Sequence, residues 1–506
     1  MNETIEEKTI KNGLLLKNQV AESLLYPKPL WVIFNDLTGI PRPSRHERLC
    51  IDYVKDFAKQ LGLSAIEDSV GNVSIYKPAT AGMENCELVI LQCHLDMVPE
   101  KNKDKVHDFL KDSIEAYVDG DWVKANGTTL GADNGLGVAA ALAVLASNSI
   151  QHGPLMCLFT IDEETGLTGI KAIGPNDFVK KAILLNLDSE EEGELCIGCA
   201  GGADIFVDYA YEQEVSRKDS VAFKISISGL KGGHSGVDIN LGRANANKVL
   251  FKFLDVADVT FNFRISSFKG GNMRNAIPRE AFVIIVMPVE ESEEFINFVS
   301  EYEDGLFKDF SGIETDLILS VAGVELPEFV MNSESQDNFI SSICSSENGV
   351  IFFDKDIPDL PRTSSNMGIV ELSHGTAKVV FLVRSFVDAS RDDCVSNISS
   401  KFERIGTVKI EVTGNYPAWK PSVHSEILDI CKTTYIEMYN KEPRVYAVHA
   451  GLETGYLGGV YPDWDMISFG PTIKYPHSPD EKAEIPSVGR FWNFLIEVLK
   501  RVPLKK

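Results

Sequence analysis

The segment LVILQCHLD, residues 88–96, decides the fold class because it joins an apolar run directly to a polar cluster. Its first six residues are typical of a strand that is buried on both faces, as in a parallel sheet. Two later runs, LMCLFTI at 155–161 and AILLNL at 182–187, have the same character. A strong helix former with small residues, GVAAALAVLA at 137–146, lies between the first two runs. Strands that alternate with helices predict an α/β layer structure.

The middle of the chain has a different pattern. Alternating strands such as VAFKISI at 221–227 and AFVIIV at 281–286 are separated by helical patterns such as that of residues 244–256. This is typical of an α+β arrangement, in which one face of each strand is solvated.

An α/β pattern returns after Pro417, with a helix predicted at 426–439, a strand at 466–469 and a last helix at 488–499. We therefore expect an α/β catalytic domain with a mixed, largely parallel sheet, formed by residues 1–202 and 417–506. An inserted α+β domain at 203–416 interrupts it. A chain of 506 residues is long enough for two domains.

Composition excludes several functional classes. The formal charge of −25 argues against a nucleic-acid or anionic-membrane surface. Met1–Glu22 lacks the basic and apolar regions of a signal peptide, and no run of 18 apolar residues predicts a membrane span. Nine scattered cysteines indicate free thiols in a reducing cytosol. Cys196 and Cys199 form one Cys-x-x-Cys pair, for which a zinc or redox role stays an alternative.

Acidic and histidine residues follow each of the three N-terminal strands. The carboxyl ends of parallel strands line the binding crevice of an open sheet. So many carboxylates at one edge repel one another unless cations neutralise them. Two divalent ions would do so, and imidazole with carboxylate ligands favours zinc, with cobalt or manganese possible. The clusters are His94-Leu95-Asp96, Asp162-Glu163-Glu164 and Asp188-Ser189-Glu190, with loops at Gly131–Gly135 and His477–Glu481.

The spacing within two clusters predicts a division of roles. Adjacent side chains in an extended segment point in opposite directions, so Glu163 and Glu164 could do different jobs: one binds metal and the other accepts a proton. His94 and Asp96 lie on the same side, so Asp96 could orient the imidazole. Taken alone, most of these motifs are better explained by a solvated loop, a turn or a helix cap, and Asp133 in its glycine-rich loop is an example. The metal hypothesis depends on their combination.

The order of these motifs resembles the co-catalytic zinc peptidases of the aminoacylase and carboxypeptidase clan, and within it most closely the aminoacyl-histidine dipeptidases, also called Xaa-His dipeptidases or bacterial cytosolic carnosinases. The resemblance extends from about residue 27 to the end of the chain. The motifs that carry it are IPRPS at 40–44, TLGADNG at 129–135, GLKGGHSG at 229–236, RNAIP at 274–278, HAGLE at 449–453 and SFGPT at 468–472.

The resemblance implies a role for each matching residue of the catalytic domain. His94, Asp133 and Asp188 would bind one metal ion, and Asp133, Glu164 and His477 would bind the other, with Asp133 as the bridge. Glu163 would be the general base and then the general acid, while Asp96 would orient His94. The peptide bond after the bridging aspartate would be cis, at Asp133–Asn134.

The inserted domain would act as a lid that contributes to substrate binding. His234 would polarise the scissile carbonyl, and Asn275 and Arg384 would hold the substrate carboxylate. His449 and Glu453, which we expect in the returning catalytic part, would shape the pocket, although a structural role is equally open.

The predicted enzyme is a cytoplasmic metallodipeptidase that hydrolyses short dipeptides and favours Xaa-His substrates such as carnosine. The resemblance implies a homodimer. We expect no nucleic-acid or membrane partner. The alternatives are an N-acyl amino-acid amidohydrolase or a tripeptidase with the same site, and a non-catalytic binding relative.

Overall fold

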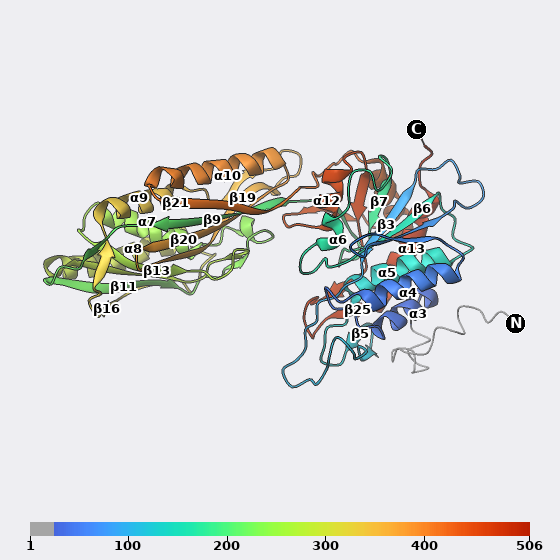
Figure 1. Ribbon diagram of the computed structural model, residues 1–506, viewed down its shortest axis with the longest axis horizontal. Coiled ribbons are helices and arrows are strands. Elements are labelled where there is room, and N and C mark those ends of the chain that lie inside the picture. Colours follow the sequence, from blue (N-terminus) through green and yellow to red (C-terminus); the bar gives the residue numbers. More distant parts are fainter. Residues whose placement is uncertain (1–24, 506) are drawn as a thin grey trace. The chain divides into compact units, whose positions relative to one another are not determined.

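The computed structural model describes residues 25–505, which divide into two compact units (Figure 1). The first unit contains the described residues up to Gly198 together with Pro421–Ala447 and the chain from Tyr456 onward. The second contains Cys199–Lys420 and Val448–Gly455. The segment Met1–Glu22, for which a signal peptide was not expected, lies outside the described residues. Within residues 25–505, no helix is both long enough and apolar enough to cross a bilayer.

An eight-stranded mixed sheet forms the middle of the first unit, in the order β1-β2-β6-β3-β7-β23-β8-β22. The four neighbouring strands β6, β3, β7 and β23 are parallel, whereas β1–β2, β2–β6 and β23–β8 pair antiparallel. The three apolar runs of the sequence form β3, β6 and β7, as predicted, and they adjoin one another. The strands are β1 (Ala65–Glu67), β2 (Val73–Lys77), β3 (Val89–His94), β6 (Leu155–Thr160), β7 (Ile183–Asn186), β8 (Glu194–Cys199), β22 (Arg444–Val448) and β23 (Asp465–Ser468).

The helix α5, Ala132–Ala146, is buried on nearly all sides. Its alanines and glycines let α3 and β3 pack closely against it, and α4 packs on β2. It begins at Ala132, five residues before the predicted start, but Asp133 and Asn134 have non-helical backbone angles, so the regular helical turns begin after the cis peptide bond between them. The other helices of this unit are α3 (Lys28–Thr38), α4 (Arg48–Gln60), α6 (Thr168–Lys171), α11 (Glu426–Tyr439), α12 (Glu453–Val460, shared with the second unit) and α13 (Ile485–Lys500).

A second sheet of the first unit has the order β24-β25-β5-β4. Its strands are β4 (Ala116–Asp119), β5 (Trp122–Ala125), β24 (Ile473–Lys474) and β25 (Lys482–Glu484). The hairpin between β24 and β25 carries His477, whose φ of 59° places the residue in the left-handed region.

The second unit is built on a nine-stranded antiparallel sheet, with four helices on one face (Figure 1). Alternate residues of β11, such as Phe223 and Ile225, join the core under the helices, while Lys224 and Ser226 lie on the opposite face. The unit is therefore α+β, as expected. Its elements are β9 (Gly201–Ala210), β11 (Ser220–Ser228), α7 (Ala246–Asp258), β13 (Arg264–Gly270), β15 (Ala281–Pro288), α8 (Ser292–Asp309), β16 (Ile318–Val324), α9 (Ser333–Ser345), β18 (Gly349–Phe353), β19 (Pro361–Ser373), β20 (Thr376–Ser385), α10 (Asp388–Phe402) and β21 (Val408–Tyr416), with the short pairs β10 (Gln213–Val215) with β17 (Phe329–Met331) and β12 (Gly233–His234) with β14 (Ala276–Ile277).

Two repeats of the same β-α-β-β-α-β topology form the sheet of the second unit. One runs β11-α7-β13-β15-α8-β16, and the other runs β9-α9-β19-β20-α10-β21. Their strands lie in the orders β16-β11-β15-β13 and β21-β9-β20-β19, and β13 pairs antiparallel with β19 where the two meet. The first repeat is thus nested in the chain between β9 and α9 of the second.

Candidate metal centre

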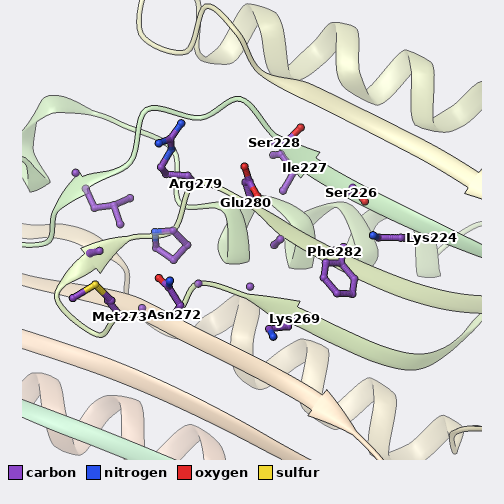
Figure 2. A pocket seen from close by; sticks show the side chains of 18 residues that line it. Lys224, Ser226, Ile227, Ser228, Lys269, Asn272, Met273, Arg279, Glu280 and Phe282 are labelled. Atoms are coloured by element: carbon purple, nitrogen blue, oxygen red, sulfur yellow. The ribbon is translucent and has the colours of Figure 1, made fainter. Parts of the chain in front are cut away.

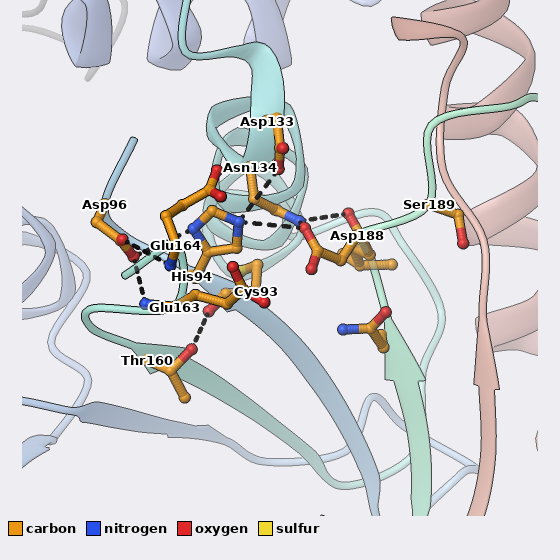
Figure 3. Close-up of polar contacts among 12 residues, drawn as sticks. Cys93, His94, Asp96, Asp133, Asn134, Thr160, Glu163, Glu164, Asp188 and Ser189 are labelled. Atoms are coloured by element: carbon orange, nitrogen blue, oxygen red, sulfur yellow. Dashed lines mark hydrogen bonds and ion pairs between the residues drawn. The ribbon is translucent and has the colours of Figure 1, made fainter. Parts of the chain in front are cut away.

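Three ligand-bearing segments follow the neighbouring parallel strands β6, β3 and β7. His94 is the last residue of β3, Asp188 comes two residues after β7, and Glu163 and Glu164 lie in the turn after β6. In Figure 3 the side chains of His94, Glu164 and Asp188 point toward a common centre. The sheet edge therefore gathers these residues as the sequence predicted.

Asp133 lies between two imidazoles at the start of α5. Its Oδ1 is 3.1 Å from His94 Nε2, and its Oδ2 is 3.2 Å from His477 Nε2. Asp188 Oδ1 lies 3.3 Å from the same His94 nitrogen, and Glu164 Oε2 lies 3.0 Å from His477 Nε2. The five residues form two groups that share Asp133. The Asp133–Asn134 peptide bond is cis, as the resemblance implied.

The donor atoms fit two divalent metal ions. Two ligand atoms at about 2.0–2.1 Å from a tetrahedral zinc ion are about 3.4 Å apart. The imidazole–carboxylate separations of 3.0–3.3 Å are close to that value. Glu164 Oε1 is also buried without a hydrogen-bond partner, which leaves one more carboxylate oxygen available to a cation. The roles of the five residues as ligands stay predictions.

The electrostatics of the cluster show how strongly it attracts positive charge. Burial lowers the pKa of His94, but Asp188, Asp133 and Asp96 together raise it well above its ordinary value. Hydrogen bonds to Asp133 and Glu164 raise the pKa of His477 to about 11. Burial raises the pKa of Asp188 and of Glu164. The carboxylates therefore favour positive charge at both imidazoles, as they would favour bound cations.

Asp96 organises two segments at once. Its Oδ1 is 3.2 Å from His94 Nδ1, and the orienting role stays a prediction. The same carboxylate accepts hydrogen bonds from the backbone N–H groups of Glu163 and Glu164, at 3.1 and 3.2 Å, and from Ser44 Oγ at 2.8 Å. The prediction that Glu163 and Glu164 lie in an extended segment was wrong, because these two N–H bonds fold them into a turn.

No sequence motif indicated a role for several buried or half-buried polar residues around the centre. Asn134 Nδ2 donates to Leu187 O at 3.1 Å and to the Asp188 carboxylate. Burial, together with Asp133 and Asp188, raises the pKa of Glu190 to about 8. The remaining two, Arg42 and Glu481, bond to the backbone beside the ligands. Arg42 belongs to the motif IPRPS at 40–44, and Glu481 belongs to the loop His477–Glu481. These motifs did not indicate what the two side chains contact.

The predicted substrate residues lie in the second unit, including His449 and Glu453, which were expected in the catalytic part. The segment Val448–Gly455 belongs to the second unit. There His449 Nε2 lies 2.7 Å from Ser364 Oγ of β19. Burial, Arg384 and His234 lower the pKa of His449 to about 3, so this imidazole is neutral. Glu453 is also buried.

His234, Arg384 and His449 converge around Gly236. A Cβ at Gly236 would lie 3.1 Å from His234 Cε1, 3.2 Å from Arg384 Nε and 2.1 Å from His449 O. Asn275 O accepts a hydrogen bond from Ser235 N at 2.9 Å, which holds the two predicted substrate segments together. Arg384 Nη1 donates to Tyr416 Oη at 2.7 Å. Tyr416 and Ser364 therefore support the predicted substrate residues, and no motif identified them.

A pocket of about 550 Å³ lies on the second unit beside these segments (Figure 2). Gly233 and Ala276, neighbours of His234 and Asn275, line one side of it. Lys224 lies 4.3 Å from the ring centre of Phe282. The remaining charged groups of its lining are Lys269, Arg279 and Glu280.

The Cys-x-x-Cys alternative has no support among the described residues. All nine cysteines are free thiols, as expected, and Cys196 and Cys199 are buried. Burial raises the pKa of Cys199, which disfavours the thiolate that zinc or redox chemistry needs. Within residues 25–505, the group of His94, Asp133 and Glu164 is the one found with metal-binding spacing.

Comparisons with known proteins identify the family to which the chain belongs. The sequence model of "Peptidase family M20/M25/M40" matches residues 90–501. The cytosol non-specific dipeptidase of Escherichia coli (strain K12) is 43% identical over 483 residues, which cover 96% of this chain and 99% of that protein. The crystal structure of aminoacylhistidine dipeptidase from Vibrio alginolyticus has a TM-score of 0.92 and 42% identity, covering 96% of this chain and 98% of that one.

More distant structures share the fold alone. Aminopeptidase PepT from Bacillus cereus has a TM-score of 0.55 at 15% identity, covering 95% of this chain and 99% of that one. Because the family model spans most of the sequence and a relative is 43% identical over nearly all of it, this chain belongs to peptidase family M20/M25/M40.

Proposed function

We propose that the protein is a metallodipeptidase that hydrolyses short unblocked dipeptides and favours Xaa-His substrates such as carnosine. The observation that carries the proposal is Asp133, whose two oxygens face the imidazoles of His94 and His477. Such an arrangement suits two ions that share one carboxylate. The relatives in Escherichia coli and Vibrio alginolyticus, both named as dipeptidases, support the substrate class. We propose zinc as the metal, with cobalt or manganese as substitutes.

The residues of the first unit divide the work of peptide hydrolysis. His94, Asp133, Asp188, Glu164 and His477 would hold two ions, which would polarise the scissile carbonyl and make water more acidic. Glu163 takes the proton of the attacking water and delivers it to the leaving amine. Asp96 keeps the His94 ring oriented with Nε2 toward Asp133 and Asp188, and its two backbone hydrogen bonds fix the turn that carries Glu163.

The second unit would supply substrate selection. Arg384 offers a fork of donors for the peptide carboxylate, together with Asn275. His234 would donate to the carbonyl oxygen as negative charge develops on it. His449, neutral because of burial and the neighbouring Arg384, would offer an uncharged hydrogen-bonding edge near Arg384. These roles rest on the family resemblance and on the convergence of His234, Arg384 and His449 around Gly236 within their own unit.

A substrate panel and one variant test the proposal. The zinc-loaded protein should hydrolyse carnosine and other unblocked dipeptides faster than acetyl-amino acids or tripeptides. Glu163→Gln should retain two metal ions and lose at least about 100-fold in kcat, since general acid–base catalysis contributes about 10²–10⁴. Glu84→Gln, an exposed change of the same kind, should be indistinguishable from the native protein.

Three outcomes would contradict the proposal in different ways. Turnover of acetyl-amino acids or tripeptides alone would replace the substrate class and keep the site. Full activity of Glu163→Gln would reject the general-base role. A native protein that binds fewer than two ions and hydrolyses nothing would favour a non-catalytic binding relative.

We also propose a cytosolic location and a homodimer. The location is supported by the free cysteines and by the name of the Escherichia coli relative. The dimer rests on family resemblance, and light scattering of the active protein at assay concentrations tests it. A fully active monomer would reject the dimer as the working form.

A further inference from the structure

Two buried charged residues beside the metal centre have no role in the proposed reaction. Glu481 and Arg42 are each only 2% exposed. Neither forms a salt bridge with a side chain in the described part of the chain, so each charge is offset by hydrogen bonds to the backbone. Burying a charge without a countercharge is costly unless good hydrogen bonds replace water. This cost is explained if the backbone segments that the two residues hold need a fixed position.

Glu481 holds the loop that carries the bridging aspartate. One carboxylate oxygen accepts from the N–H groups of Leu130 and Gly131, at 2.7 and 2.9 Å. The other accepts from Ala132 and Asp133, at 2.8 and 3.3 Å. Four consecutive N–H groups thus form an anion-binding concavity that this one carboxylate fills. Gly131 makes the concavity possible because its φ of 70° lies in the left-handed region.

Arg42 connects the same loop to the end of β3. Its Nη2 donates to Gly131 O at 2.5 Å, and its Nη1 donates to Leu95 O and Asp96 O, both at 2.9 Å. A Cβ at Gly131 would come within 2.7 Å of Nη2, and one at Gly135 within 2.6 Å. Two glycines of the GADNG motif therefore leave space for the guanidinium.

These contacts join the segments that carry the candidate ligands. Glu481 follows His477 by four residues on the β24–β25 hairpin and binds the Asp133 loop. Arg42 ties the Asp133 loop to the residues that follow His94, and Asp96 ties those residues to the turn of Glu163 and Glu164. All of these contacts involve backbone atoms. The positions of those backbone atoms determine where the ligand side chains lie.

We infer that Glu481 and Arg42 are positioning residues, which fix the backbone of the Asp133 loop so that its carboxylate can bridge two metal ions. The inference rests on the proposed two-metal function and extends it to residues that touch neither metal nor substrate. Glu481→Gln is the sharpest perturbation, because the amide replaces one acceptor oxygen by a donor. At least two of the four backbone N–H groups then face an NH₂ group.

The test compares zinc binding by the native protein, Glu481→Gln and the matched control Asp480→Asn, which removes an exposed charge one residue away. Each metal-stripped protein is titrated with zinc against a chromophoric chelator. Glu481→Gln should raise the Kd of at least one ion by about 10- to 100-fold, the usual effect of losing a group that supports a ligand. The control should stay within about twofold of the native Kd, as expected for a surface change.

A spectroscopic measurement separates positioning from stability alone. The visible absorption of the cobalt-loaded protein reports ligand geometry, and it should change in Glu481→Gln even at saturating cobalt. An unchanged spectrum and unchanged zinc Kd in folded Glu481→Gln would overturn the inference. If that variant does not fold, the zinc Kd and the cobalt spectrum are measured on Arg42→Lys instead, with the same expected and overturning results. A native protein that fails to bind two ions would instead reject the proposed metal centre.

Discussion

Replacing Asp96 by asparagine removes one negative charge and one acceptor from a carboxylate with four neighbours. The least damaging orientation of the amide keeps oxygen at the Oδ1 position, where it faces His94 and accepts from Glu163 N. The NH₂ group then occupies the Oδ2 position, where Ser44 Oγ and Glu164 N now donate to the carboxylate. The Ser44 hydroxyl can rotate to accept, but the N–H of Glu164 cannot.

The magnitude follows from these contacts. A backbone N–H left without an acceptor costs about 1–3 kcal/mol, and removing the charge from a charge-assisted hydrogen bond costs about 1 kcal/mol more. The sum of about 2–4 kcal/mol corresponds to a loss of about 30- to 700-fold, since about 1.4 kcal/mol is a factor of ten. Because the turn carries both Glu163 and Glu164, we expect the loss in kcat as well as in zinc affinity.

Stopped assays of carnosine hydrolysis at saturating zinc, with metal content measured on the same samples, check this prediction. Ser44→Ala is the matched control, because it removes a single bond and should cost at most about tenfold. An Asp96→Asn enzyme that keeps a third of the native kcat and its zinc affinity would refute the reasoning. So would a Ser44→Ala enzyme that loses as much as Asp96→Asn.

Further predictions concern pH, stability and substrate affinity. Because neighbouring carboxylates raise the pKa of His94 and of His477, zinc must displace protons, so zinc affinity should rise with pH between about 6 and 8; chelator competition that gives a flat profile would contradict this. Burial raises the pKa of Asp36 from 3.8 to about 7, so its contribution to stability is full below about pH 4 and is lost as pH rises toward 7. Asp36→Asn should remove this loss, which is at most about 4 kcal/mol at about 1.36 kcal/mol per pKa unit. Urea unfolding at pH 5 and pH 8 measures it, and an equal change in the free energy of unfolding between these pH values for variant and native protein would reject the prediction. Arg384→Lys should raise the KM for dipeptides by about tenfold or more with a smaller change in kcat, because a point charge replaces a fork of donors; steady-state kinetics with an unchanged KM would argue against a carboxylate-binding role.

The sequence predicted the parallel centre of the first sheet closely because those strands are buried on both faces. Continuous apolar runs that end in charged residues left few alternatives, and β3, β6 and β7 lie within one or two residues of the predicted bounds. The histidine and carboxylate clusters followed from the same rule, since strand ends meet at one edge. Local sequence pattern was sufficient to predict these strands and the clusters at their ends.

Features that depend on distant contacts were not accessible in this way. The turn of Glu163 and Glu164 forms because the carboxylate of Asp96, 67 and 68 residues away, accepts both N–H groups. His449 lies in the second unit and contacts Ser364, 85 residues earlier. The two nested repeats share a topology that no motif or short period indicates. Each case needs a pairing across sequence distance that local periodicity does not encode.

The connections of the second unit explain how a large insertion is tolerated. Cys199 and Trp419, near its first and last residues, exchange backbone hydrogen bonds of 3.0 Å, and Ala200 N donates to Val448 O at 3.1 Å. An insertion whose ends adjoin adds little loop-closure entropy to the domain that it interrupts. The candidate ligands and their supporting residues all belong to the first unit, with its own core. Changes in the second unit, such as Arg384→Lys, should therefore alter the choice of peptide while zinc affinity stays native, and a parallel loss of zinc affinity would show that the two units are energetically coupled.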